Sequence, residues 1–559
     1  MAHPFQAASR CHSTLRPVAK AAHLTCLAMV ASGLWMAPGV QAQTAPAGPT
    51  PEATLPTVTV TADPGGSAGV VNQQRAASVG KSGVAVQDTP FSIGVIDAEQ
   101  AREAGAKNVQ DALLYSAGVY AGRYGFDTRG DWAAIRGLSP SAYVDGLRGI
   151  YGFYNNVRPE FYTLERVEVL KGPSSGLYGQ ADLGGIVNVV TKRPQKTTAR
   201  EISLQVGSHS RKQVAADLTG PLNQDGSLLY RLVALQRESD TLVDHVNDDA
   251  LVVMPSLTWQ PNADTSLTLQ YIHQKNESKV SSQFLPQKGT LDAAPLGTIP
   301  ISRFVGEPGW DRYDTSKDEF SVFWDQRLSS TWKLAANLRK TRSDSVTREI
   351  YAAVGPIPDD AGNMPRTIHT ADRETDVLAA DVRLEAKAQW GSTRHTFAVG
   401  VDHQNAQWDE FNYSNSATGG GDINLYSPVY GYVNTGALTF SDRPDNKIVQ
   451  TGVYVMDHME WGPWVLSGAV RHDRASNELQ NIGTTPDTVV KNTATTGRLG
   501  LMYRMANGFS PYVSASTAFN PNLGTDGTAS NSYLKPTTGE QTEAGVKYLS
   551  DSGKTSAAF

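Results

Sequence analysis

Residues 164–173 read Leu-Glu-Arg-Val-Glu-Val-Leu-Lys-Gly-Pro, and residues 184–192 read Gly-Gly-Ile-Val-Asn-Val-Val-Thr-Lys. Both contain a short run rich in Val, Ile and Leu with glycine at one end, which is typical of buried strands joined by tight turns. Upstream, residues 91–95 alternate as a strand, and Asp97 is placed to cap a helix that ends at Gly105. With a second short helix over 109–114, the sequence predicts a compact mixed α+β domain over residues 84–195.

From residue 196 the pattern changes to long strands that alternate apolar and polar residues, as in Leu267, Leu269 and Tyr271. Short turns are expected at 223–226 and 260–264, whereas the stretches 276–317, 344–375 and 404–447 read as long polar loops. Strands of about ten residues with short turns at one end and long loops at the other are typical of an outer-membrane β-barrel. A large soluble β-sandwich or β-solenoid is the alternative, since it explains the alternation but not the asymmetry of the loops.

Composition agrees with a barrel and excludes some other classes. The mean hydropathy of −0.33 argues against a helical membrane protein. A barrel has a water-soluble average composition, and the 21 Tyr and 10 Trp suit aromatic girdles. The formal net charge of −6 gives no support to nucleic-acid binding.

The N-terminus has the features of a cleavable targeting sequence. Residues 1–42 contain three basic residues and no acidic one, then an apolar stretch and the small-x-small sequence Val40-Gln41-Ala42. This pattern predicts a secretory signal peptide. Both cysteines, Cys11 and Cys26, lie inside it, so the exported chain is expected to have no disulfide and no thiolate metal site.

Residues 43–83 are rich in Pro, Gly, Ala and Thr and are predicted to form a flexible arm. Inside it lies Thr57-Val58-Thr59-Val60-Thr61, a run of β-branched residues without a sheet of its own. Such a segment is suited to pair with the sheet edge of another protein through its main chain. A short edge strand of its own domain is the alternative.

Several of these motifs together resemble the plug of TonB-dependent outer-membrane receptors. The motifs that carry the resemblance are Ile135-Arg136-Gly137-Leu138, Tyr143-Val144-Asp145-Gly146, the two stretches quoted above, and Leu177-Tyr178-Gly179. Farther on, Phe519-Asn520-Pro521, Leu534-Lys535-Pro536 and residues 539–547 resemble the siderophore-receptor branch, of the ferrichrome and pyoverdine type. The resemblance covers essentially all of residues 57–559.

The resemblance implies an all-β transmembrane barrel, 22-stranded in the family, with an N-terminal mixed α+β plug domain inside it. It implies a receptor, not an enzyme, that binds a ferric siderophore at the cell surface and transports it into the periplasm. The implied partners are outer-membrane lipid and TonB with the proton-driven ExbB-ExbD complex. The implied location is the outer membrane of a Gram-negative bacterium. Iron would arrive inside the siderophore, so no bound cofactor and no protein metal site are expected.

The resemblance also suggests roles for individual residues. Thr57, Val58, Thr59, Val60 and Thr61 stand where the family keeps its TonB box. A second group is expected to contact the ligand from the plug apices: Arg123, Tyr124, Phe153 and Tyr154. A third group is expected to form ion pairs between plug and barrel: Arg136, Lys171 and Glu543.

Two alternatives stay open on function. The same fold could carry haem, cobalamin or a glycan, and, more distantly, the chain could be a secreted soluble β-rich protein. Gly172-Pro173-Ser174-Ser175-Gly176 matches the G-x-S-x-G string of hydrolases, but the residues after it are poor helix formers, so no nucleophile elbow is expected. Arg129-Gly130-Asp131 is an adhesion-like tripeptide that we attribute to chance.

The length of the C-terminal region leads to one further expectation. At about ten residues a strand plus loops, residues 196–559 hold roughly 14–16 strands rather than 22. The sequence therefore predicts a barrel that is incomplete at its C-terminus, an open sheet curved around an intact plug. A naturally short, closed form is the alternative.

Overall fold

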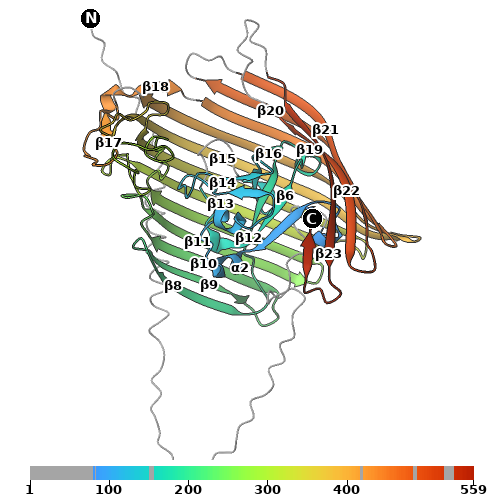
Figure 1. Ribbon diagram of the computed structural model, residues 1–559. Helices are drawn as coiled ribbons and strands as arrows, with labels where there is room; N and C mark the ends of the chain where they lie inside the picture. The colour runs from blue at the N-terminus through green and yellow to red at the C-terminus, as the bar shows by residue number, and fades with distance from the viewer. Residues whose placement is uncertain are drawn as a thin grey trace, which may run out of the picture. The chain divides into compact units, whose positions relative to one another are not determined.

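The structure is a computed structural model, and it describes residues 80–81, 83–149, 157–415, 419–442, 444–481, 488–521 and 534–559. The described residues form two parts, a small plug and a large antiparallel wall (Figure 1). The predicted signal peptide, residues 1–42, and the predicted TonB box, residues 57–61, lie outside the described residues.

The plug is built on a five-stranded sheet with the order β1-β6-β7-β4-β5. Its strands are β1 (Ile93–Asp97), β4 (Ser141–Val144), β5 (Leu147–Arg148), β6 (Leu164–Lys171) and β7 (Gly185–Thr191). All neighbours are antiparallel except β4 and β7, which are parallel. The remaining plug elements are η3 (Val86–Asp88), α2 (Ala98–Glu103), α3 (Val109–Leu113), the β2–β3 pair (Val119–Ala121, Ala133–Ile135), η4 (Phe161–Thr163) and α4 (Ser175–Tyr178).

Local signals of the sequence account for most plug elements. The Asp97 side chain accepts hydrogen bonds from the backbone N–H groups of Glu99 and Gln100, as predicted for the cap of α2. Gly105 adopts a φ of 99°, which lets the chain leave the helix. At the G-x-S-x-G string, α4 forms a single helical turn that begins at Ser175, inside the string, and that Gly179 ends at a φ of 72°.

The wall is one antiparallel sheet of fifteen strands in the described residues, within the predicted range, and all of them are long except the three-residue β24. They are β8 (Ala199–Val206), β9 (Lys212–Pro221), β10 (Leu228–Glu238), β11 (Asp248–Asn262), β12 (Thr265–Ser278), β13 (Arg312–Arg327), β14 (Trp332–Ala352), β15 (Asn363–Trp390), β16 (Thr393–Asn415), β19 (Pro444–Trp461), β20 (Trp464–Asn481), β21 (Thr488–Tyr503), β22 (Phe509–Asn520), β23 (Thr537–Leu549) and β24 (Ser556–Ala558). The loop elements β17 (Asp422–Asn424), η5 (Thr435–Ala437) and β18 (Thr439–Asp442) lie between β16 and β19.

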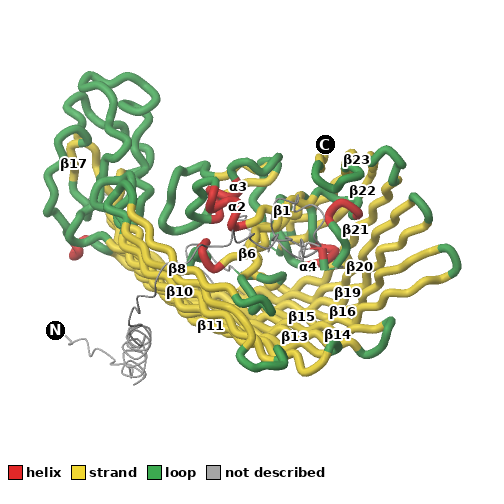
Figure 2. The backbone as a smooth tube through the Cα atoms, turned by 90° about the horizontal axis from the view of Figure 1, so that it is seen from below, coloured by secondary structure: helices red, strands yellow, loops and turns green. Residues whose placement is uncertain are grey.

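The strand order of the wall is that of a closed barrel, running from β10 to β24 and then to β8 and β9. Ladders of defined register join every consecutive pair of wall strands from β8–β9 to β23–β24, whereas the described ladders include none between β24 and β8. At this seam seven of the eight residues of β8 are exposed. The prediction of an open sheet is therefore not decided by the strand order, and it stays a prediction. Figure 2 shows the wall curving around the plug.

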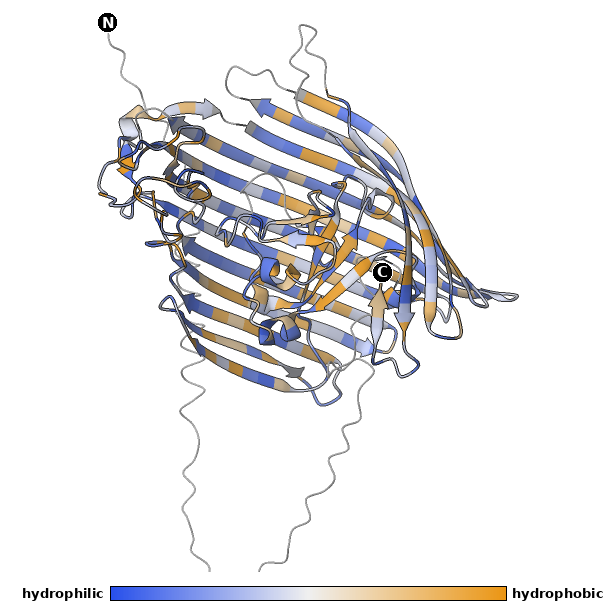
Figure 3. Ribbon diagram, viewed as in Figure 1, coloured by the Kyte–Doolittle hydropathy of each residue, from blue (hydrophilic) through white to orange (hydrophobic). Residues whose placement is uncertain are grey.

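Side chains of the wall alternate between two environments, which Figure 3 shows as alternating bands along the strands. In β11, Val252 and Met254 are buried toward the plug, whereas Leu257 and Trp259 are exposed on the outer face. This period of two confirms the alternation predicted from the sequence. The apolar outer face suits contact with lipid. The buried side chains of the inner face suit a lumen that the plug fills.

Aromatic residues gather on the outer face close to the short turns. Exposed rings on the described strands that lie within five residues of these turns include Trp259, Trp324, Trp332, Trp390, Trp461, Trp464 and Phe509. Such a belt is typical of strands that end at a membrane–water interface. In the described residues no helix is long and apolar enough to cross a membrane.

The loops at the opposite end are long but shorter than predicted. The loop 279–311 agrees with the sequence pattern. The predicted loop 344–375 is wrong, since β14 extends to Ala352 and β15 begins at Asn363. The predicted loop 404–447 is likewise too long, because β16 extends to Asn415.

Candidate functional site

The plug presents an exposed hairpin at the long-loop end of the barrel. Arg123 and Tyr124 follow β2, and both side chains are exposed. The Arg123 guanidinium stacks over the Tyr124 ring at 4.7 Å, and that ring meets Trp132 edge-on at a centroid distance of 6.0 Å. These two predicted ligand residues therefore form one cation–aromatic group on an accessible face.

The hairpin is fastened to the loop that follows β12. The Thr128 N–H donates to the Ser281 hydroxyl at 3.1 Å, and the Thr128 hydroxyl donates to the Lys279 carbonyl at 2.8 Å. The Ser282 hydroxyl donates to the Asp127 carboxylate at 2.8 Å. These contacts place the hairpin at the long-loop end and hold its backbone against the wall.

Beneath the exposed tip lies a buried polar group. The Arg129 guanidinium donates to both carboxylate oxygens of Asp127 at 3.0 Å, and the Trp132 indole N–H donates to Asp127 at 2.9 Å. Burial raises the pKa of Asp127, but the Arg129 hydrogen bonds more than offset it and hold that pKa below its usual value. Because Arg129 is buried, the Arg129-Gly130-Asp131 tripeptide is not presented for adhesion.

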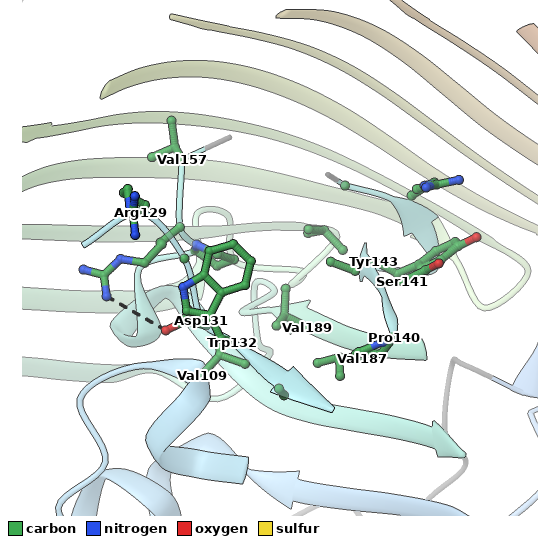
Figure 4. A pocket seen from close by; sticks show the side chains of 18 of the residues that line it. Val109, Arg129, Asp131, Trp132, Pro140, Ser141, Tyr143, Val157, Val187 and Val189 are labelled. Atoms are coloured by element: carbon green, nitrogen blue, oxygen red, sulfur yellow. Dashed lines mark ion pairs between the residues drawn. The ribbon is translucent and has the colours of Figure 1, made fainter. Parts of the chain in front are cut away.

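A cavity of about 320 Å³ lies behind the hairpin, between the plug sheet, α3 and the wall strands β13 and β14 (Figure 4). Val189, Trp132 and Asp131 contribute to its lining. The Asp131 side chain is 10% exposed, and its nearest cation is the Arg158 guanidinium at 3.9 Å. Burial raises the pKa of Asp131 to about 6 against the opposing effect of Arg158.

Of the three residues predicted to form ion pairs between plug and barrel, two are paired in the structure. The Arg136 guanidinium donates to Gln541 at 3.0 Å and forms a close ion pair with Glu543 on β23. The Tyr512 hydroxyl donates to the other Glu543 oxygen at 2.7 Å. Burial and the neighbouring Arg136 lower the pKa of Lys171, which Glu543 opposes, so Lys171 lies near this group. No ion pair of Lys171 is found among the described residues.

Further plug–wall ion pairs were not predicted. Asp145, in the Tyr143-Val144-Asp145-Gly146 motif, pairs with Arg339 on β14 at 2.8 Å and with Arg193 at 3.0 Å. Burial opposes ionisation of Asp145, but these two guanidinium groups hold its pKa below the usual value. Lys192 pairs with Asp217 on β9 at 2.7 Å. On the plug side, Asp145 and Lys192 lie in motifs that the sequence analysis had singled out, whereas their wall partners lie in unremarkable alternating strands.

Other predicted residues have no role in an exposed site. Phe153 and Tyr154 lie outside the described residues. Ser174 and Ser175 of the G-x-S-x-G string are buried, and the Ser175 hydroxyl accepts a hydrogen bond from the Phe519 N–H at 3.0 Å. In the described residues no group of three or more His, Cys, Asp or Glu side chains is placed to hold a metal ion.

Comparison with protein families gives two matches. Residues 258–559 match the family described as TonB dependent receptor-like, beta-barrel, and residues 85–186 match the TonB-dependent Receptor Plug Domain. Together these matches cover both parts of the described structure.

Individual relatives point the same way. The chain is 31% identical over 470 residues to the ferrioxamine B receptor of Salmonella typhimurium strain SL1344, covering 82% of this chain and 65% of that receptor. It is 30% identical over 531 residues to the ferrichrome outer membrane transporter/phage receptor of Escherichia coli K12, covering 88% of this chain and 70% of that protein. The chain thus spans slightly less than two thirds of the length of the ferrioxamine B receptor.

Solved structures confirm the fold. The closed form of the ferric-catecholate import receptor Fiu from Escherichia coli K12 superposes with a TM-score of 0.76 at 21% identity, covering 86% of this chain and 74% of that one. At this identity the likeness concerns the fold alone.

Proposed function

Because the chain belongs to the family of TonB-dependent receptors, we propose that it binds a ferric siderophore at the long-loop end of the barrel and transports it into the periplasm. Relatives named as receptors for ferrioxamine B and ferrichrome support this cargo. Transport of this kind makes and breaks no covalent bond, so the proposal is a receptor and not an enzyme.

The orientation of the plug, with different contacts at the two ends of the barrel, supports the proposal most directly. Its exposed hairpin with Arg123 and Tyr124 is tied to the long loop 279–311. Its first residues are tied to the other end, where Asp88 pairs with Arg504 beside the short turn 504–508 at 3.1 Å. The two ends of the lumen therefore meet different partners, with the ligand on the side of the long loops.

Recognition would rest on the hairpin tip. An exposed guanidinium beside aromatic faces suits a bulky complex that presents carbonyl oxygens and apolar edges. Phe153 and Tyr154 remain candidates for the same surface by their place in the sequence. Iron is cargo inside the ligand, so the protein grips the organic shell.

The energy would come from the opposite side of the membrane. Thr57–Thr61 are proposed as the TonB box, which adds as a strand to TonB and receives work from the ExbB-ExbD complex. The exposed aromatic belt and the apolar outer face of the wall support a location in the lipid of the outer membrane of a Gram-negative bacterium.

Uptake of radiolabelled iron by iron-starved cells tests the proposal. A strain without its own hydroxamate receptors, expressing this chain, is given the ferric complexes of ferrioxamine B, ferrichrome and a pyoverdine, one at a time. We expect energy-dependent uptake of at least one of them, and loss of that uptake with Val58→Pro, since proline removes a main-chain donor from the strand that TonB would pair with.

The same strain distinguishes the alternative cargos. Haem, cobalamin and an oligosaccharide are offered under the same conditions. Uptake of one of these, with none of the ferric siderophores taken up, would contradict the siderophore proposal while leaving the family unchanged.

A further inference from the structure

The segment Gly80–Phe91, which leads into β1, is held by the wall at several points. Lys547 of β23 donates to the carbonyl oxygens of Val86 and Thr89 at 2.6 and 2.7 Å. The Arg498 guanidinium lies 3.3 Å from the centroid of the Phe91 ring. The first described contact along the chain is made by Lys81, and it differs from the others because it is a fully buried ion pair.

Lys81 reaches into the lumen face of the wall. Its ammonium lies 2.7 Å from Asp381 on β15 and 3.3 Å from Asp402 on β16, and its side chain is 5% exposed. The same ammonium lies 4.4 Å from the centroid of the Tyr454 ring and 4.8 Å from that of Tyr178. A buried cation with two carboxylates and two aromatic faces is held firmly.

Lys81 supplies one of the few cations at this site. In the part of the wall that the structure describes, Asp381, Asp402 and Asp473 are contacted by two cations, Arg383 and Arg471. Arg383 is shared with Glu385, whose other cation, Lys333, lies closer to Asp325. Withdrawal of Lys81 therefore leaves one buried carboxylate without compensation, and that state strongly favours its return.

The backbone at Lys81 is strained as well. Its φ is 57°, in the left-handed region that non-glycine residues rarely adopt. Such a conformation persists where the surroundings over-determine it, and here the buried ammonium does so.

We propose that Lys81 is a latch between the plug and the wall. It holds the segment 80–91 against β15 and β16, and a pull on the chain N-terminal to it must extract the ammonium before load reaches the edge strand β1. The uncompensated carboxylate then draws the lysine back, so the latch resets after each pull. The functional part of this proposal rests on the proposed function, in which TonB supplies the pull.

Two double variants with the same change in charge test the latch. Lys81→Met with Asp381→Asn removes the latch and leaves the net charge of the site unchanged. Arg383→Met with Glu385→Gln removes a wall cation and a carboxylate that it contacts, also leaves the net charge unchanged, and keeps Lys81 beside both Asp381 and Asp402. Both proteins are purified in detergent, and hydrogen exchange of their backbone amides is measured by mass spectrometry.

We expect the amides of residues 80–91 to exchange about tenfold faster in the Lys81 variant than in the wild type, while those of β6 and β7 stay unchanged, because local opening alone has become easier. The Arg383 variant should exchange like the wild type. Equal exchange in the Lys81 variant and the wild type, or equal acceleration in both variants, would overturn the latch.

Pulling on single receptors from the N-terminus supplies the mechanical readout. A first rupture at the segment 80–91 is expected in the wild type and in the Arg383 variant, and its persistence in the Lys81 variant would overturn the proposal. Neither measurement needs a siderophore or TonB. A wild type that takes up no ferric siderophore would therefore refute the proposed function and leave the test of the latch intact.

Discussion

Arg136 illustrates how a single residue is aimed by its backbone. It has a φ of 52°, and Gly137 follows at 83°, so the chain reverses at the end of β3 and points the guanidinium toward β23. There it meets Glu543, which Tyr512 also contacts. Because the guanidinium is 39% exposed, the pair adds little to stability and serves chiefly to fix where the plug lies.

The first prediction at this scale concerns the exposed hairpin. Tyr124→Ala should weaken binding of the ferric siderophore that the wild type takes up by about 1–3 kcal/mol, the range of an aromatic anchor. Loss of the ring also removes the face on which Arg123 stacks. Equilibrium titration of the purified receptor measures the change. Tyr115→Ala, at a tyrosine that is 97% exposed, serves as the control and should bind normally.

A second residue-scale prediction concerns pH. The pKa of Asp131 is raised to about 6 from 3.8, so the folded state binds a proton more readily than the unfolded state. The cost of ionising Asp131 in the folded state therefore lowers the free energy of unfolding. This cost is small below about pH 4, grows between about pH 4 and pH 6, and is complete above about pH 6. Asp131→Asn should therefore stabilise the protein by up to about 2–3 kcal/mol at pH 8 and by almost nothing at pH 4.

Thermal unfolding in detergent at the two pH values measures this difference. A gain in melting temperature that is equal at pH 4 and pH 8 would show that the buried charge of Asp131 is not its cause.

At the scale of elements, the sequence predicts the strands of the plug well and the ends of the wall strands poorly. The plug strands are short, buried and bounded by glycine, so pattern and structure coincide in β6 and β7. By contrast, β14 and β15 continue beyond the apolar band as a polar ribbon. Since residues 341–349 are polar at almost every position, the apolar–polar alternation that marks a strand is lost there, and the residues read as loop.

Ion pairs between elements are hidden from sequence for a different reason. Lys81 and Asp381 are 300 residues apart, and each stands in a pattern that has many equivalent charges. Only the register of β15 and β16 and the path of the segment 80–91 bring them together. The resemblance to a family suggested Arg136 and Glu543 because those positions belong to a motif, whereas Lys81 belongs to none.

The long loops are themselves a folded element, which leads to the third prediction. Arg366 is fully buried, donates to the carbonyl oxygens of Val305 and Gly306 at 3.0 and 3.2 Å, and pairs with Glu307 at 2.8 Å. Glu307 in turn accepts a hydrogen bond from the Gly431 N–H. Arg366→Met should cost the loop cluster about 3–5 kcal/mol, since it leaves Glu307 as an unpaired buried charge.

Limited proteolysis of the loop 279–311 measures the effect and should show faster cleavage. The control is Arg348→Met, at an arginine whose pair with Asp372 is solvent-exposed at 2.8 Å and worth about 0–1 kcal/mol. Cleavage at the wild-type rate in the Arg366 variant would show that the loops hold together without this residue.

On the scale of the whole molecule, the plug is fastened around its circumference by polar contacts, in addition to an apolar cluster that joins Leu177 and Tyr178 to Tyr454 and Met456 of the wall. Asp145, Lys192 and Arg136 each engage a different wall strand. Buried ion pairs of this kind contribute more to specifying one arrangement than to net stability. That property suits a plug that must lie in one position at rest and still move when it is pulled.

Close backbone contact is the other condition for seating the plug, and Gly179 provides it. A Cβ atom at Gly179 would lie 1.8 Å from the Gln450 amide nitrogen and 2.5 Å from Asp473 Oδ1. Gln450 has little freedom to move aside, since its amide group donates to Asp473 at 2.7 Å and its oxygen accepts from the Gln180 N–H at 3.2 Å. The wall network therefore has to break before a larger residue fits.

Gly125 is a control for Gly179. Both residues have a φ of 72°, where alanine is strained, and Gly179 also has a ψ of −127°, which lies outside the left-handed helical region. A Cβ atom at Gly125, however, meets nothing within 4 Å. We expect Gly179→Ala to be about 1–3 kcal/mol less stable than Gly125→Ala, because it adds a clash with the wall to the backbone strain. Melting temperatures in detergent measure this, and cells with the Gly179 variant should become sensitive to a bulky antibiotic that an intact outer membrane excludes. Equal melting and equal resistance in the two variants would show that α4 does not need this close approach to seat the plug.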